Sequence, residues 1–162
     1  MASTFSILSQ DQPGVLMRIA ALIYRRAYNI ISLSVSPTED AGVSRFTVVV
    51  DGEERICEQV RKQLEKLTEV ISVTNLTKEG NTVERYLKLI KVSAPPETRP
   101  SIFQTAEVFR CRVVDLGGST LTLEVTGAKS KVDACVKALQ PFGLIETAGS
   151  GQVAVSRSGF DE

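Results

Sequence analysis

The sequence predicts an α+β protein made of two ferredoxin-like domains in tandem, each with the order strand, helix, strand, strand, helix, strand. Three observations predict this fold. Apolar residues recur at helical spacing in two segments of each half, and they alternate with polar residues in the segments between. A polar stretch at residues 77–82 separates the halves, and 162 residues suffice for two small domains. We therefore place the domains at residues 1–78 and 82–162.

The first strand and first helix are separated by a turn. Residues 5–8 are a short apolar run, and residues 10–14 contain the turn formers Pro13 and Gly14. Helical periodicity then predicts a helix from about Gly14 to Ala27, and Asn29 marks its end. The periodic apolar residues are Leu16, Ile19, Ala20, Ile23 and Ala27.

Two strands, a helix and a fourth strand complete the first domain. Apolar residues alternate with polar ones before Pro37 and again before Asp51, which predicts two half-buried strands. These apolar residues are Ile31, Leu33 and Val35, then Phe46, Val48 and Val50. The second helix carries its apolar face on Ile56, Val60, Leu64 and Leu67, and Ile71 and Val73 mark the fourth strand.

The second domain repeats this order. A strand at residues 86–92 precedes a helix at 102–109, with Pro100 suited to its first turn. Residues 111–116 and 121–125 predict a hairpin across Gly117-Gly118, because two glycines suit a tight primed turn. A last helix carries Val132, Cys135, Val136 and Leu139 and stops at Pro141. Two final strands are expected around Leu144 and at 153–155, joined near 149–151.

Composition limits the possible functions. Histidine is absent, which removes the commonest general acid/base and metal ligand and argues against an enzyme. The 19 basic and 19 acidic residues are interspersed, so a nucleic-acid role is disfavoured, and the cluster of Arg18, Arg25 and Arg26 is interpreted as a solvated helix face. Each half alone has a marginal core, since about 80 residues bury only roughly 60% of their unfolded surface, so we expect oligomers.

The sequence also predicts a cytoplasmic protein. No segment has the roughly 20 apolar residues that span a bilayer, and the first residues lack a signal-peptide pattern. Cys57, Cys111 and Cys135 are odd in number and widely spaced, which is typical of a reducing compartment. Cys111 lies between Arg110 and Arg112, which favours a lowered pKa, although a buried strand position is the plainer interpretation.

The candidate site is the segment at residues 11–16. Gly14 lets a ligand approach the backbone, and the free N–H groups of Gly14, Val15 and Leu16 carry partial positive charge, which suits a carboxylate. Asp11 would hold an ammonium group. Asn29 and Ile30 would lie near the mouth of this loop and offer an amide and an apolar wall. Residue types alone favour the alternative, a plain turn with Pro13 at the start of the helix.

Several segments together resemble the small regulatory subunit of acetolactate synthase (acetohydroxyacid synthase), over nearly the whole chain. The specific one is Tyr-Asn-Ile-x-Ser-Leu at 28–33 followed by Pro-Thr-x-Asp at 37–40. Asp-Gln-Pro-Gly-Val-Leu at 11–16 is shared by many amino-acid-sensing ACT domains. Further likeness lies at 44–47, 63–67, 83–85 and 89–92. The chain departs from the family pattern at Asp11, where Asn is common, and at Ala27, where Gly is frequent.

The resemblance implies a non-catalytic subunit with an N-terminal ACT domain in branched-chain amino-acid biosynthesis. Such a subunit activates a separate large subunit, which would carry thiamine diphosphate, Mg and FAD, and confers feedback inhibition, usually by valine. The effector would lie between the ACT domains of a homodimer. It would touch Asp11, Pro13, Gly14, Val15 and Leu16 of one chain and Asn29 and Ile30 of the other. The alternatives are a stand-alone amino-acid-sensing ACT protein that regulates another partner and a small enzyme of ferredoxin-like fold.

Overall fold

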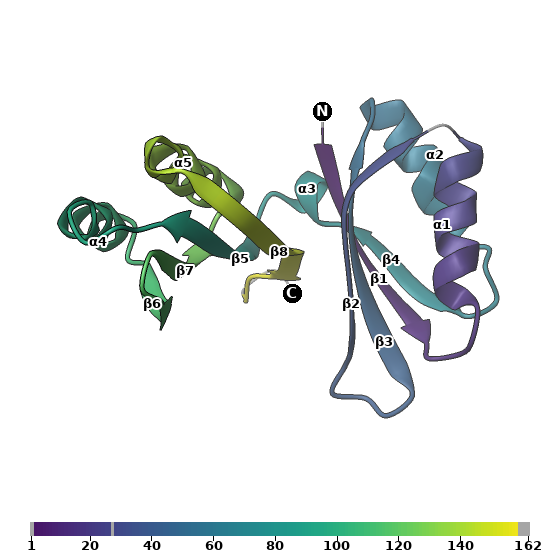
Figure 1. Cartoon of the computed structure of the whole chain (residues 1–162). Helices are drawn as coiled ribbons and strands as arrows, with labels where there is room; N and C mark the ends of the chain where they lie inside the picture. The colour runs from purple at the N-terminus through teal and green to yellow at the C-terminus, as the bar shows by residue number, and fades with distance from the viewer. Residues whose placement is uncertain (1, 27, 159–162) are drawn as a thin grey trace. The chain divides into compact units, whose positions relative to one another are not determined.

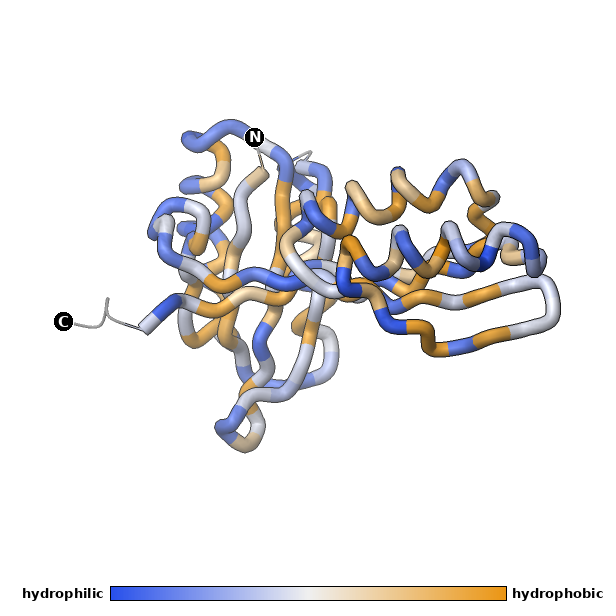
Figure 2. Tube along the Cα trace, turned by 90° about the vertical axis from the view of Figure 1, so that its left-hand side faces the viewer, coloured by the Kyte–Doolittle hydropathy of each residue, from blue (hydrophilic) through white to orange (hydrophobic). Residues whose placement is uncertain are grey.

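The structure is a computed structural model that describes residues 2–26 and 28–158. Residue contacts divide the chain into two compact units. Unit 1 comprises Met1–Val83 together with Gln152–Glu162, and unit 2 comprises Glu84–Gly151. Each unit has its own hydrophobic core, so each is described by itself. Along the trace, hydrophobic and hydrophilic residues alternate within the helices and strands (Figure 2).

Unit 1 is a four-stranded antiparallel sheet with two helices on one face (Figure 1). The strand order is β2-β3-β1-β4, so β2 and β4 are the edges. Its elements are β1 (Ala2–Gln10), α1 (Val15–Arg25), β2 (Asn29–Pro37), β3 (Val43–Asp51), α2 (Glu54–Leu64) and β4 (Val70–Asn75). The predicted order of elements is thereby confirmed for the first half.

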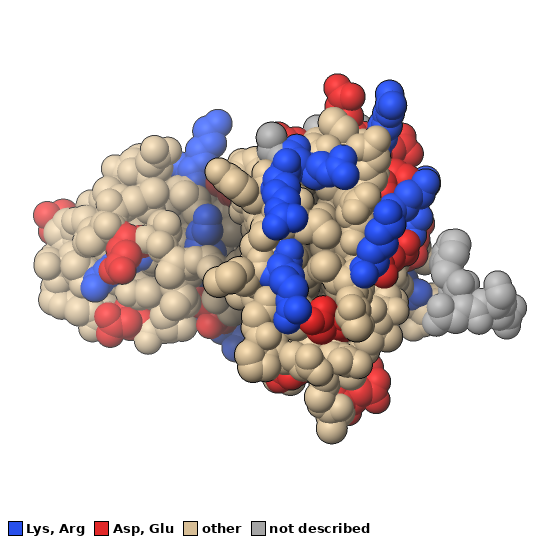
Figure 3. Space-filling view, turned by 90° about the vertical axis from the view of Figure 1, so that its right-hand side faces the viewer, with Lys and Arg blue, Asp and Glu red and all other residues tan. Residues whose placement is uncertain are grey.

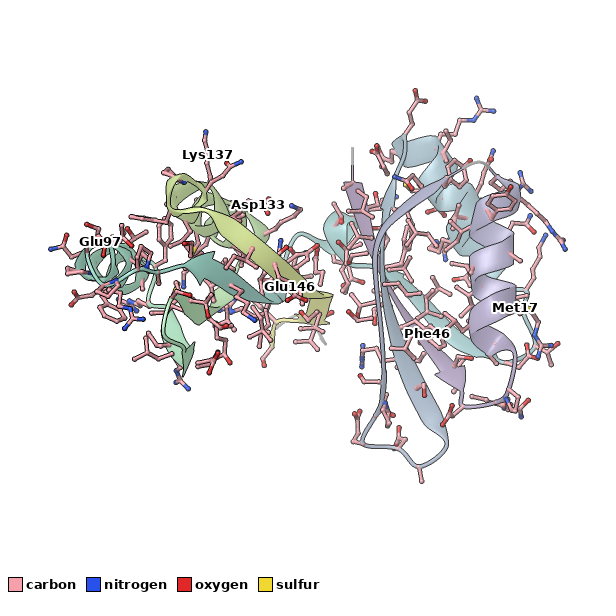
Figure 4. All side chains as sticks on the ribbon, in the orientation of Figure 1. Met17, Phe46, Glu97, Asp133, Lys137 and Glu146 are labelled. Atoms are coloured by element: carbon pink, nitrogen blue, oxygen red, sulfur yellow. The ribbon has the colours of Figure 1, made fainter. Side chains whose placement is uncertain are left out.

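The core of unit 1 lies between this sheet and its helices. From α1, Val15, Ile19 and Ile23 are buried, because residues four apart share one side of a helix. They meet alternate residues of the central strands, Phe5 and Ile7 from β1 and Phe46, Val48 and Val50 from β3. Phe46 is seen on the helix side of the sheet and Met17 on the outer side of α1 (Figure 4). The predicted end of this helix, Ala27, lies outside the described residues.

The buried pattern predicted for the second strand is wrong at Ile31. A bulge between Ile30 and Ser32 shifts the register of β2 against β3, so Ile30 packs on the core and Ile31 is 44% exposed. Val35 lies on the helix side but is 46% exposed, because β2 is an edge strand. Simple alternation cannot reveal an inserted residue, since a bulge moves every later side chain to the other face.

The opposite face of the same sheet is polar and is contacted by Gln152 near the end of the described residues. Thr4 and Ser6 are buried there, and Gln152, itself only 5% exposed, donates from Nε2 to Thr4 Oγ1 at 3.2 Å. The backbone N–H of Gln152 donates to Ser32 Oγ at 3.1 Å, and Ser34 Oγ donates to the Gln152 carbonyl at 3.0 Å. This segment therefore belongs to unit 1 by its contacts.

The polar stretch at 77–82 is only partly a linker. A short helix, α3 (Leu76–Glu79), occupies its first half. Asn75 caps the helix by accepting from the Lys78 N–H at 3.2 Å, and Gly80 ends it in a left-handed conformation with φ 70°. The polar residues that predict a linker are thus helix caps as well.

Unit 2 repeats the architecture, with strand order β6-β7-β5-β8 and the helices α4 and α5. The elements, including one short 3-10 helix, are β5 (Thr82–Ser93), α4 (Arg99–Val108), β6 (Arg112–Leu116), β7 (Thr120–Gly127), α5 (Lys129–Leu139), η1 (Gln140–Phe142) and β8 (Leu144–Ser156). The two halves are therefore both βαββαβ, as predicted. The buried residues of α5 are Val132, Cys135 and Leu139.

Three local predictions for the second half are wrong. The two final strands are one continuous strand, β8, in which Gly151 adopts φ 75° without reversing the chain. The hairpin exists, but neither Gly117 nor Gly118 has the positive φ that a primed turn requires. Cys111 is half-buried and precedes β6 instead of lying within a buried strand.

Candidate functional site

The loop between β1 and α1 leads into a helix start that is open: among the described residues, no side chain caps it, and some of its N–H groups are unused. Gly14 caps α1 with φ 84° and ψ −5°, a left-handed conformation that favours glycine, and no side chain caps the helix. The Val15 N–H makes a long bond of 3.4 Å to the Gln12 carbonyl. Within the described part of the chain, the N–H groups of Gly14 and Leu16 donate to no other group. An anion placed here would meet two unused donors and the positive end of the helix.

The rest of the predicted loop is exposed and anchored by its backbone. Asp11 and Pro13 are both exposed, whereas Val15 is buried in the core of unit 1. The Asp11 N–H donates to the Gly42 carbonyl at 2.8 Å, which ties this loop to the turn before β3. The loop thus presents the carboxylate of Asp11, the ring of Pro13 and the free N–H groups of Gly14 and Leu16.

Arg18 is a further candidate for the site, and sequence reasoning missed it. Its guanidinium reaches back one helical turn, and a Cβ added at Gly14 would lie 3.7 Å from its terminal nitrogen. Arg18 also pairs with Glu69 at 2.6 Å between Nη1 and Oε1. The sequence assigns this residue to a solvated cluster; its position four residues after Gly14 is the signal that places it over the start of the helix.

Asn29 and Ile30 do not lie near this loop within one chain, contrary to the prediction. Asn29 pairs with Asp51, which in turn pairs with Ala2 at the start of β1, whereas the loop follows Gln10 at the other end of that strand. The 11 residues of α1 separate the two places by about 16 Å. Figure 1 shows the loop and the start of β2 at opposite ends of α1. A site containing both needs a second chain.

The edge of unit 1 that carries β2 exposes apolar side chains. Leu16 is 46% exposed, and Ile31 and Val35 on β2 are exposed to a similar extent. Asn29 is exposed at the beginning of this strand. An edge strand with free backbone groups and apolar side chains is suited to pair with another strand.

Two cysteines of unit 2 interact. Sγ of Cys111 and Sγ of Cys135 are 3.4 Å apart. Cys135 is fully buried and remains the thiol that donates, so its pKa is raised, while this hydrogen bond and then Lys131 lower the pKa of Cys111. In the described ranges, no cluster of three Cys, Asp or Glu residues could hold a metal ion. The helices among residues 2–26 and 28–158 include none long and apolar enough to cross a bilayer.

Comparison with known families matches both units. Residues 5–72 match the model described as AHAS small subunit-like ACT domain, and residues 85–158 match that described as small subunit of acetolactate synthase. The ACT match covers the open helix start and the beginning of β2. The fold of the first unit, the loop before α1 and this family match therefore identify it as an ACT regulatory domain.

Proteins that match almost the whole length of the chain identify the family to which it belongs. The chain is 44% identical to a probable acetolactate synthase small subunit of Archaeoglobus fulgidus, over 97% of this chain and 98% of that one. It is 46% identical to the acetolactate synthase small subunit of Mycolicibacterium smegmatis, over 95% and 90%. The crystal structure of the Thermotoga maritima small subunit superposes with a TM-score of 0.89 at 38% identity, covering 98% and 99% of the two chains.

The chain belongs to the family of acetolactate synthase small subunits. It is accordingly a regulatory, non-catalytic subunit in branched-chain amino-acid biosynthesis, and its family implies a catalytic large subunit as its partner.

Proposed function

We propose that this chain activates the acetolactate synthase large subunit and confers feedback inhibition by a branched-chain amino acid, with valine as the first candidate. The observation that carries the proposal is the open start of α1. Its unused N–H groups donate to the effector's carboxylate, and Asp11 accepts from the ammonium group. Arg18 adds positive charge beside the carboxylate position.

A homodimer completes the proposed site. If two β2 edges pair antiparallel about a twofold axis, Asn29 of one chain lies opposite Pro37 of the other. Pro37 pairs with Ser44, at the end of the sheet where the loop after Gln10 lies. Such pairing brings Asn29 and Ile30 of one protomer to the loop of its partner. Exposed Leu16 and Val35 then supply apolar surface for a branched side chain.

The proposed mechanism is a coupling between two sites. Effector bound across the dimer favours one arrangement of the protomers and so alters how they hold the large subunit. Allosteric couplings are typically about 1–3 kcal/mol and are reciprocal, so large-subunit binding must change effector affinity by the same factor. We assign the effector role to residues 1–78, and we expect thiamine diphosphate, Mg and FAD in the large subunit. Cys57, Cys111 and Cys135 are free thiols, although two of them are close together, and this supports a cytoplasmic complex.

The test is acetolactate formation by the large subunit with and without this chain, titrated separately with valine, leucine and isoleucine. We expect higher activity with the chain present and inhibition by one of the three amino acids. Calorimetry with that amino acid, on the chain alone and on the complex, measures the coupling. Identical affinities in the two titrations would contradict coupling through binding free energy, and unchanged activity would contradict the proposed function.

A further inference from the structure

The outer face of α1 is apolar although it lies in solvent. Val15, Ile19 and Ile23 face the core, whereas Met17 is 75% exposed and Tyr24 is 81% exposed. The last two are seven residues apart and so lie on one side of the helix, opposite the core. Tyr and Met are enriched at protein interfaces, and Tyr buries a large area at little cost in conformational entropy.

Basic side chains surround this stripe. Two shallow grooves of about 270 and 580 Å³ lie on the helices, and both are lined by Arg26 and Gln63. The cations lining one or both grooves are Arg18, Arg25, Arg26, Lys62 and Lys66. Figure 3 views this face and shows Lys and Arg gathered over it in two groups, with Asp and Glu mainly beside the right-hand group.

Most of this positive charge is not neutralised within unit 1. Arg18 pairs with Glu69, and Glu65, the acidic residue of the larger groove, pairs with Arg61. The other four cations form no salt bridge in the described part of the chain; they are Arg25, Arg26, Lys62 and Lys66. The whole chain has zero formal charge, so this face is a local concentration of positive charge.

The chemistry of the face fits a protein better than a small anion. A phosphate-bearing ligand would use the cations but has no need of Met17 and Tyr24, which are the two most exposed apolar side chains of α1. A protein surface uses both, with Tyr and Arg as central anchors and Lys at the solvated rim. Opposite charge on the partner speeds association and fixes orientation.

We propose that this α1–α2 face, defined by Met17, Tyr24 and the five cations, docks an acidic surface of the catalytic large subunit. This inference rests on the proposed function, because it names the surface through which that partner is bound. It also places partner contact and effector contact on one rigid element: α1 starts at Gly14 and carries Tyr24 and Arg25 in its last turn. A displacement of the helix start by the effector then moves the docking face.

The experiment measures the affinity of the full-length chain for the large subunit, using two variants with matched controls. Arg25→Glu reverses a charge in the last turn of α1, and Lys137→Glu does the same in the last turn of α5. Tyr24→Ser removes an exposed apolar side chain, and Val108→Ser removes one that is 78% exposed on α4. All four side chains lie at the surface, so each variant is expected to fold.

We expect Arg25→Glu and Tyr24→Ser each to weaken large-subunit binding by about tenfold or more. The two controls should stay within about twofold of wild type, and binding of wild type should weaken as salt is raised. Valine affinity of the isolated variants should equal that of wild type.

Three outcomes overturn the inference in distinguishable ways. If wild type activates the large subunit while both α1 variants bind it as tightly as wild type, the docking face is wrong and the proposed function stands. If inorganic pyrophosphate binds the isolated chain, and Arg25→Glu abolishes only that binding, the face is an anion site. If wild type does not bind the large subunit, the proposed function fails and this inference fails with it.

Discussion

The two units share one topology but differ at the turn that leads into their first helix. In unit 1 the turn ends at left-handed Gly14, and the N–H groups of Gly14 and Leu16 are unused. In unit 2 the corresponding turn contains Pro95 and Pro96, and Pro100 in the first turn of α4 has no N–H. At the cap position, the Thr98 N–H donates to the Pro95 carbonyl at 3.0 Å, whereas the Gly14 N–H is unused. The described part of unit 2 still leaves the N–H groups of Arg99 and Ser101 without an acceptor, so the two helix starts differ at two positions, the cap and the second residue.

A cationic side chain fixes the turn before α4 in unit 2. Arg99 donates from Nε to the Ala94 carbonyl at 2.9 Å and from Nη2 to the carbonyls of Gly117 and Gly118 at 2.6 and 2.7 Å. It thereby ties the β5–α4 turn to the β6–β7 hairpin. Both ferredoxin-like units thus have a possible binding position at the turn before the first helix. The residues of that turn determine which N–H groups of the helix are left unused.

The largest expected effect comes from the two separate cores. Ile23→Ala in unit 1 and Leu139→Ala in unit 2 each remove a fully buried side chain, at an expected cost of about 2–5 kcal/mol. Hydrogen exchange followed by mass spectrometry should show lost protection confined to the unit that carries the change. Loss of protection across both units from either variant would mean that the chain unfolds as one cooperative body.

Gly14→Asp should remove effector inhibition. It places a carboxylate where the proposed effector's carboxylate binds and adds a side chain at φ 84°, so we expect valine affinity to fall roughly 100-fold. Gly80→Asp is the control, because it has the same charge and a similar φ of 70° with open space around it. The readout is acetolactate formation against valine concentration. Retained inhibition in Gly14→Asp would place the effector elsewhere.

These two predictions draw on features that are local in the sequence. The order of elements follows from periodicity, because long apolar stripes such as Val60 and Leu64 of α2 identify both a helix and its buried side. The loop at 11–16 is recognisable from residue types alone, since turn formers and a helix start involve only neighbouring residues. Local rules are therefore sufficient to locate this loop as the candidate site.

What the sequence does not reveal depends on pairing between distant segments. The bulge at Ile31 arises from the register of β2 on β3, and the continuity of β8 through Gly151 arises from its pairing as an edge of the second sheet. The distance between Asn29 and the loop depends on the direction of α1. Arg18 is the exception: it stands only four residues after Gly14, and its side chain folds back toward that glycine. The bulge and the continuity of β8 are not fixed by residues near in sequence.

Arg99→Met should weaken unit 2 without changing regulation. The substitution removes three hydrogen bonds from a charged donor, which predicts a loss of about 1–3 kcal/mol in stability. Thermal denaturation of the variant measures this loss, and Lys137→Met, a surface change on α5, is the control. Valine inhibition should be unchanged. A changed valine inhibition curve would show that the β5–α4 turn of unit 2 also takes part in effector binding.

The smallest expected effect concerns thiol reactivity, where the two units again differ. Unit 1 has a single buried cysteine, Cys57, whereas unit 2 has the pair in which Cys135 lowers the pKa of Cys111. Because the thiolate is the nucleophile, alkylation of Cys111 by iodoacetamide should reach half its maximal rate at a lower pH than the roughly 8.5 of an ordinary cysteine. Cys57 and Cys135 should react slowly in the folded chain.

Two substitutions at position 135 separate the hydrogen bond from burial as the cause. Cys135→Ala removes the donor and leaves a small apolar group, so the midpoint of the Cys111 profile should rise. Cys135→Ser keeps a donating O–H at the same place and should hold the midpoint low. If both variants moved the midpoint equally, the hydrogen bond from residue 135 would not be the cause. The nearby charge of Lys131, the remaining influence that lowers this pKa, would then be the group to change next.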